Sequence, residues 1–220
     1  MREDIPDPSE LPLLGQDELD EIVKKHGMYL VGQQGGARAV VQYRNLSNLD
    51  FRGSDLSQAD FSCSALINAD LSNCNFSSAN FFACDMRNSD LRNANLSRSD
   101  LRGAYIAGAN LTKANMEGAD MREGKVMMKG RKGGLEDRKR SGGVGAKTVL
   151  IGAKMTDANL TGAQAQGADF TDADLSKSQL NGANLSGVNF EGANMVDSDM
   201  TDADLSFANM HETIIAGALM

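Results

Sequence analysis

Histidine and cysteine, the side chains that most often perform chemistry in proteins, are scarce in this sequence of 220 residues. The two histidines, His26 and His211, stand far apart, and nothing in the sequence links them. The three cysteines, Cys63, Cys74 and Cys84, form no C-x-x-C pair. An odd number of cysteines without that spacing favours reduced thiols and therefore a cytoplasmic protein. We expect no catalytic residue, no metal and no cofactor.

A phosphate-binding loop is the ligand motif that the sequence approaches most closely. Gly143, Gly145, Lys147 and Thr148 lie in the stretch GVGAKT. The motif G-x-x-x-x-G-K-[ST] needs glycine directly before lysine, between a strand and a helix. Here Ala146 separates the two residues and a repeat strand follows, so we reject a nucleotide site.

The charge of the chain is unevenly distributed around its formal net value of -8. Residues 122–154 carry ten basic and three acidic side chains, a net charge of +7. Residues 155–220 carry Lys177 against ten acids, a net charge of -9. Residues 1–43 carry a net charge of -4, and a basic segment between two acidic ones is the main functional asymmetry of the sequence.

The positions of these charged residues are set by a repeat with a period of five residues. Sixteen consecutive large apolar residues stand at five-residue intervals from Leu46 to Met121. The pattern restarts one residue out of phase at Leu150 and runs to Met220, with Ala165 as its small member. A small residue usually stands two positions before each large one, with Asp or Asn between them. A period of five matches neither a helix nor a strand.

A chain that turns a corner every five residues explains this pattern. Each group of five residues, or pentad, points one large and one small side chain inwards, and four pentads close a square coil. Stacked coils pair their backbones at roughly 4.8 Å, and their stability comes from stacking, because no coil buries its core alone. The pattern therefore predicts an all-β solenoid. It places Cys74 and Cys84 at small inward positions and Cys63 on the outside.

The repeat resembles that of the pentapeptide-repeat family, whose consensus is A-(D/N)-L-x-x. Ala-Asp-Leu at 69–71 and 203–205, and Ala-Asn-Leu at 94–96, 109–111, 158–160 and 183–185, match this consensus. The resemblance implies a right-handed quadrilateral β-helix. It also implies two properties of some members: a likeness to duplex DNA that acts on type II topoisomerases, and pairing through the C-terminal ends.

The repeat divides the chain into four segments: an N-terminal extension with a capping helix (1–43), a first tract (44–126), a basic flexible insertion loop rich in glycine (127–149) and a second tract (150–220). Residues 1–15 are expected to be extended or disordered. Residues 16–31 are predicted to form a short helix with an apolar face of Leu19, Ile22, Val23 and Leu30. We assign this helix as the cap of the first coil; the alternative is a docking helix for a partner.

The insertion leaves from one face of the solenoid, because the repeat changes phase by only one residue across it. Two interpretations stay open: a passive solvated loop, or an arm that binds nucleic acid, an acidic protein surface or the acidic tract of another copy. The candidate partner-binding residues of such an arm are Lys129, Arg131, Lys132, Arg138, Lys139 and Arg140.

The second tract ends in repeat phase, with no capping helix after it. Its last apolar residues are Ile214, Ile215, Leu219 and Met220. An uncovered coil exposes apolar side chains and backbone edge groups. A two-fold homodimer through this end would cover them, in agreement with what the family resemblance implies.

Two functions of different class are consistent with these features. The first is a non-enzymatic scaffold or protein-interaction protein, whose unidentified partner binds the insertion or the outward apolar residues Ile67 and Phe82. The second is a DNA mimic that binds gyrase through acids of the second tract. We favour the first, because the first tract is nearly neutral and the repeats are close to plain consensus. We expect no membrane span and do not favour direct nucleic-acid binding. The mimic surface would comprise Asp169, Asp172, Asp174, Glu191, Asp197, Asp199, Asp202 and Asp204.

Overall fold

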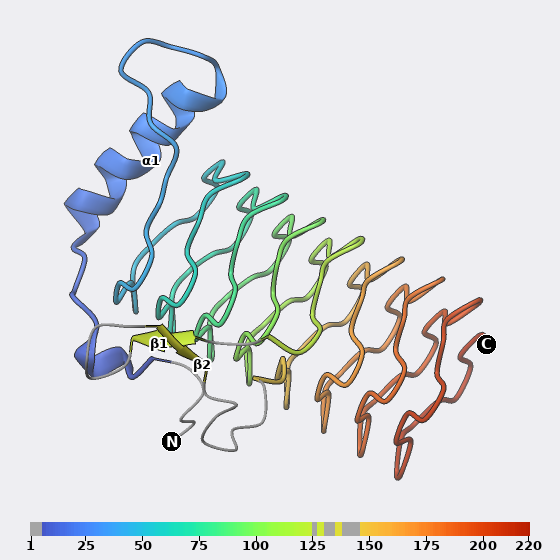
Figure 1. The fold of residues 1–220 in the computed structure, drawn as a ribbon. Coiled ribbons are helices and arrows are strands. Elements are labelled where there is room, and N and C mark those ends of the chain that lie inside the picture. Colours follow the sequence, from blue (N-terminus) through green and yellow to red (C-terminus); the bar gives the residue numbers. More distant parts are fainter. Residues whose placement is uncertain (1–5, 125–126, 130–134, 138–145) are drawn as a thin grey trace.

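The computed structural model describes residues 6–124, 127–129, 135–137 and 146–220. Its regular elements are the 3-10 helix η1 (Pro8–Glu10), the helix α1 (Gln16–Leu30) and the antiparallel strands β1 (Met127–Lys129) and β2 (Leu135–Asp137). The rest is a solenoid whose coils stack from the N-terminal to the C-terminal end (Figure 1). Neither helix in the described part of the chain has the length and apolar character needed to cross a membrane.

Each coil of the solenoid contains twenty residues. Parallel backbone pairing joins the residue before each large apolar one to the residue twenty positions on, as in the series Asp50, Asp70 and Asp90. The pairing recurs every five residues, so each coil has four sides of five residues, as the period predicts. We name these sides A, B, C and D, after the pentads centred in the first coil on Leu46, Phe51, Leu56 and Phe61.

Most large residues are preceded by Asp or Asn, and this side chain closes the turn that follows. Asp70 Oδ1 accepts the backbone N–H of Ser72 at 3.1 Å, and Asn95 Oδ1 accepts that of Ser97 at 3.2 Å. Asp and Asn side chains that bond the backbone two residues on are typical of tight turns. The second residue after the large one has left-handed backbone, as at Asn68 (φ 56°), which Asn, Asp and Gly adopt most easily. These two requirements explain the polar half of the repeat.

The core is one apolar column inside the solenoid. Every central residue of a pentad from Leu46 to Met200 is at most 1% exposed. The small residue of each pentad lies beside this column, and Cys74 and Cys84 are there as predicted, where each thiol donates to a backbone carbonyl at 2.9 Å. Burial of a large apolar side chain contributes about 1.5–3 kcal/mol, so the stacked column is the main source of stability.

In the described part of the chain, no coil precedes the first one to pair with its edge. On two of the four sides, backbone groups of the N-terminal extension pair with this edge instead. On side A, the N–H of Leu14 donates to Asn45 O at 3.0 Å, and the N–H of Asn45 donates to Pro12 O at 2.9 Å. On side D, the N–H of Asp60 donates to Ala39 O at 2.9 Å. The described part of the N-terminal extension, expected to be extended or disordered, is therefore extended and paired where it meets side A.

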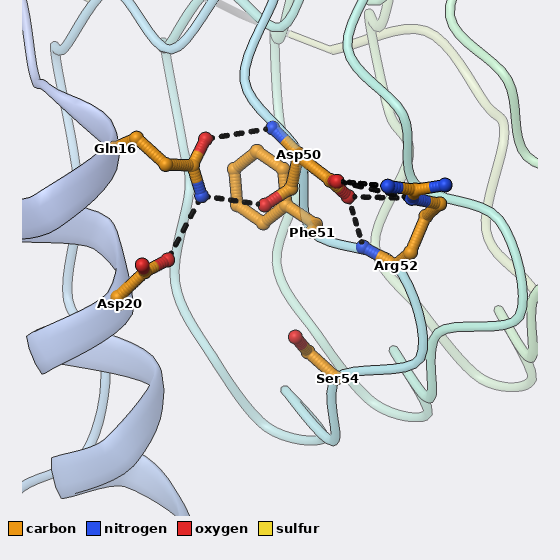
Figure 2. Close-up of a pocket in the computed structure, with 6 residues that line it drawn as sticks. All are labelled: Gln16, Asp20, Asp50, Phe51, Arg52 and Ser54. Atoms are coloured by element: carbon orange, nitrogen blue, oxygen red, sulfur yellow. Dashed lines mark hydrogen bonds and ion pairs between the residues drawn. The ribbon is translucent and has the colours of Figure 1, made fainter.

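On the other two sides, two side chains of α1 bond the edge of the first coil. On side B, Gln16 Oε1 accepts the N–H of Asp50 at 2.9 Å and Gln16 Nε2 donates to Asp50 O at 2.8 Å, as a peptide group of a neighbouring coil would (Figure 2). On side C, His26 Nε2 bonds Ser57 O at 2.9 Å. Groups from residues 12–43 thus form hydrogen bonds to the edge of the first coil on all four sides.

The helix predicted over residues 16–31 is present as α1, one residue shorter. Leu19 is fully buried, and Ile22 and Val23 pack against the core. Asp17 and Glu18 lie in the first turn, where acidic side chains stabilise a helix. The apolar face of α1 therefore lies over the core of the first coil, in the position expected of a cap.

The insertion leaves and re-enters the solenoid at one corner. Tyr105 pairs with Val149, 44 positions on instead of twenty, so 24 residues are added to this coil. Gly124 and Ala146 exchange two backbone hydrogen bonds of 2.8 Å and close the base of the insertion. Because 24 is one less than a multiple of five, the large residues after the insertion stand one position earlier than the five-residue period predicts. The backbone pairing between the coils nevertheless continues without a shift.

The boundary of the insertion differs from the predicted range of 127–149. Val149 pairs with the coils on both sides of it. Thr148 is fully buried; its hydroxyl accepts the N–H of Gly103 and donates to Leu101 O, both at 3.0 Å. These two residues therefore belong to the second tract, and we define the insertion as residues 124–147. Thr148, the last residue of the stretch that approaches a phosphate loop, has a structural role.

Candidate interaction surfaces

The side chains that could perform chemistry do not lie together at one site. Among the described residues, no three His, Cys, Asp or Glu side chains lie close enough to hold a metal ion. His26, a residue of α1, is buried between the helix and the first coil, whereas His211 lies in the last coil, exposed, with its Nε2 3.6 Å from Glu212 Oε1. The other candidate features of the protein are the surfaces that a partner would contact.

All three cysteines are free and buried. Burial disfavours the charged thiolate, which raises the pKa of Cys74 to about 11 and raises that of Cys84 as well. The prediction that Cys63 faces outwards is wrong, because it is 4% exposed and packs with Ala83. The two stack in neighbouring coils at the corner between sides D and A, where Phe82 and Tyr105 cover them.

The two apolar residues predicted to face a partner lie on different sides of the solenoid. Ile67 is half-buried on side A. Phe82 is half-buried on side D, with the guanidinium of Arg102 5.6 Å from the centre of its ring. A Cβ atom at Gly124 would lie 2.8 Å from Phe82 Cε2, so the base of the insertion rests against this ring. Phe82 supports the insertion, and the structure does not join it with Ile67 into one apolar patch.

The basic candidates belong to the insertion itself. Lys129 is the last residue of β1, which pairs with β2 in the register Met127↔Asp137 and Lys129↔Leu135. The other five candidates, Arg131, Lys132, Arg138, Lys139 and Arg140, lie outside the described residues. The structure therefore locates the base of this candidate surface, between Gly124 and Ala146, at the corner of sides D and A.

The acidic candidates of the second tract do not form one stripe. Asp169, Asp172 and Glu191 lie on side A, Asp174 and Asp197 on side B, Asp199 and Asp202 on side C, and Asp204 on side D. Four of the eight precede a large central residue and also close a turn. In one of these, Asp169 Oδ1 accepts the N–H and the hydroxyl of Thr171 at 3.1 and 2.6 Å. The acids share one end of the rod but face four directions.

The first tract neutralises its own acids through a pattern that the sequence interpretation missed. In the series Asp-x-Arg, the guanidinium folds back onto the carboxylate of its own pentad. Arg87 Nη2 lies 2.6 Å from Asp85 Oδ2, and Arg92 Nη2 lies 2.5 Å from Asp90 Oδ2. The hydrogen bonds from Arg92 lower the pKa of Asp90. Residues 155–220 contain no arginine, so the acids of that tract have no such partner.

A shallow hollow lies between α1 and side B of the first coil (Figure 2). Gln16 stands in it between Asp20 Oδ1, at 2.8 Å, and the backbone of Asp50. Arg52 bonds the Asp50 carboxylate and lowers its pKa. The charged groups of this hollow are bonded to other groups of its wall, so we assign it to the cap and not to a ligand.

Twenty-residue coils with four sides, a continuous apolar column and Asp or Asn before most central residues define a stacked pentapeptide solenoid. The family model for pentapeptide repeats matches the chain with eight copies, in overlapping stretches 45–77, 59–98, 84–123, 146–176, 153–192 and 178–217. The chain therefore belongs to the pentapeptide-repeat family. The two matched regions stop at 123 and resume at 146, on either side of the insertion.

No curated protein is significantly similar to the chain in sequence. Among solved structures, it is similar to HetL from the cyanobacterium Nostoc sp. strain PCC 7120, involved in heterocyst differentiation regulation (22% identity, 94% and 97% of the two chains, TM-score 0.30). It is also similar to QnrB1, a plasmid-mediated fluoroquinolone resistance protein (19% identity, 81% and 83%, TM-score 0.28). A pentapeptide-repeat protein of the Arabidopsis thaliana thylakoid lumen shares 32% identity over 60% of this chain and 67% of its own (TM-score 0.19).

Proposed function

We propose that this pentapeptide-repeat protein is a non-enzymatic interaction protein. It binds an acidic surface of a protein partner through the insertion 124–147, and the solenoid is the rigid mount of that insertion. The observation that carries the proposal is the attachment of the insertion: its base is closed by the pairing of Gly124 with Ala146, and the coils on both sides stay in register. Excursions from rigid scaffolds are common sites of function. The free thiols favour a cytoplasmic setting.

Comparative capture from a lysate of the source organism tests this proposal. The baits are the intact protein, a variant that lacks residues 124–147, and a full-length variant in which the basic candidates are replaced by glutamine. We expect a partner that the intact protein retains and that both variants lose. Equal recovery by all three baits would contradict the proposal and assign binding to the sides of the solenoid. The glutamine variant has Lys129, Arg131, Lys132, Arg138, Lys139 and Arg140 replaced.

The second candidate function is DNA mimicry directed at gyrase. It is supported by the acids of the second tract, which lack arginine partners, and by the similarity of the repeat to that of QnrB1. The spread of these acids over four sides gives it less support than a single stripe would. A supercoiling assay with gyrase distinguishes it from the first proposal, because mimicry predicts an effect that persists after deletion of the insertion.

We propose that a second copy of the chain covers the last coil. Large apolar side chains are exposed at this end of the second tract: Phe207 is 95%, Met220 74%, Leu219 59%, Ile214 54% and Ile215 43% exposed. A two-fold dimer would bury these residues and pair the edge of the coil. Sedimentation of the intact protein should show a dimer that dissociates in an Ile214→Asp variant; a wild-type monomer at tens of micromolar would contradict this.

A further inference from the structure

His26 is a fully buried residue that holds three parts of the N-terminal end together. It projects from α1, accepts the N–H of Ala39 on Nδ1 at 3.0 Å, and bonds Ser57 O through Nε2 at 2.9 Å. A backbone N–H only donates and a carbonyl oxygen only accepts. Nδ1 therefore carries no proton and Nε2 carries one, so these two contacts are compatible only with the neutral ring.

The two contacts lie where the cap is joined to the solenoid. Ser57 is on side C of the first coil, and Ala39 belongs to the segment that replaces side D, where its carbonyl accepts the N–H of Asp60 at 2.9 Å. A proton on Nδ1 would point at the N–H of Ala39 and break that contact. It would also place a cation in a fully buried position, which is costly without a paired charge.

We propose that His26 is an acid-sensitive latch of the cap: protonation of its imidazole releases α1 and uncovers the edge of the first coil. The released groups include the backbone of Asp50 on side B and Ser57 O on side C, which α1 satisfies in the closed form. An uncovered strand edge is a template for pairing with another extended segment. The latch thus links pH to the exposure of a second, strand-pairing surface at the end of the solenoid opposite His211.

The charges around His26 set the direction of its response. Burial, the largest effect, lowers the pKa of His26; Arg38 lowers it further, whereas the carbonyl of Ser57 and the Asp55 carboxylate raise it. Tyr29 stacks on the ring with centroids 5.7 Å apart. In the open form the pKa returns to about 6.5. The open form therefore takes up a proton as the pH falls below that value, while the closed form stays neutral.

The difference in proton binding between the open and closed forms sets how strongly cap opening depends on pH. Because the open form binds one proton more than the closed form, the ratio of open to closed cap rises by up to about tenfold per pH unit below pH ~6.5. The rise stops once the pH reaches the lower pKa of His26 in the closed form. Above pH ~7.5 both forms are neutral, and the cap has its full stability.

Native-state hydrogen exchange of the α1 amides at pH 7.5, 6.5 and 5.5, corrected for intrinsic rates, tests the latch. His26→Gln is the informative variant, because glutamine offers a donor and an acceptor but does not titrate. His211→Gln is the matched control, since His211 is the other histidine of the chain and is exposed. We expect the wild type and the control to lose α1 protection by about tenfold per unit below pH 6.5, and His26→Gln to show no such loss.

Equal pH dependence in wild type and His26→Gln, or none in wild type, would overturn the proposal. A second measurement on the wild type alone covers the case in which His26→Gln leaves the cap open at every pH. Nitrogen NMR of the imidazoles should show His26 as the Nε2–H tautomer at pH 7.5, with a titration midpoint below the ordinary histidine value of about 6.5. Titration of the His26 ring at or above about pH 6.5 would contradict the latch.

Discussion

Replacement of Leu91 by aspartate is expected to destabilise the protein by more than about 5 kcal/mol. Leu91 is a central residue of side B and is 0% exposed, with coils stacked on both sides of it. The variant loses about 1.5–3 kcal/mol of apolar burial and must also bury a carboxylate or protonate it. For a chain of this size the melting midpoint should fall by about 10–20 °C or more.

Asn93→Asp is the matched control for this experiment. Asn93 belongs to the same pentad but points outwards, where its side chain donates to Asn73 Oδ1 at 3.1 Å. The control adds the same charge two residues away, and its melting midpoint should stay within a few degrees of the wild type, because surface changes are usually worth less than about 0.5 kcal/mol. Circular dichroism melts of the two variants decide the matter. A Leu91→Asp variant that melts with the wild type would refute the inward register of the repeat.

Deletion of residues 124–147 should leave the solenoid intact. The cut joins Glu123 to Thr148 and leaves four residues between Met121 and Leu150, as between all other central residues of neighbouring pentads. Val149 then pairs with Tyr105 as it does in the full chain. Loop closure depends only weakly on loop length, so we expect a melting midpoint equal to that of the full chain or slightly above it.

Removal of one further residue should have a large effect. Deletion of 123–147 also removes Glu123, an exposed side chain, and leaves three residues between the two central positions. One side of the coil is then too short, and the second tract must either strain that corner or shift every central residue by one position. We expect a loss of at least about 3 kcal/mol, or about 6–12 °C. Equal melting of the two deletions would show that the phase of the repeat does not govern this junction.

Most of the architecture follows from the five-residue period, because that period acts locally. Whether Leu91 or Cys74 points inwards depends on the position of each within its own pentad and on nothing remote. The helix over residues 16–31 could be predicted for a similar reason, since Leu19, Ile22 and Val23 mark its buried face within two turns. The sequence also indicates the junction: in Thr148-Val-Leu150 a small residue stands two places before a large one, as in most pentads.

The contacts of the cap are different, because they join residues distant in sequence. Gln16 imitates a peptide group only because α1 places it against Asp50, 34 positions away. His26 meets Ser57, 31 positions on. Nothing in the local sequence distinguishes these side chains from others on the helix. Cys63 was misplaced for a related reason: the position after a turn faces solvent in most coils, but here Ala83 in the next coil and the ring of Phe82 cover it.

The most direct test of the proposed function is equilibrium binding of the captured partner to two proteins, the intact chain and the chain lacking residues 124–147. Both should melt alike, so a difference in binding reports the insertion and not the fold. We expect the deletion to weaken binding by at least tenfold, a difference of about 1.4 kcal/mol. Equal affinity of the two proteins would contradict a role for the insertion in binding and would place the partner on the sides of the solenoid.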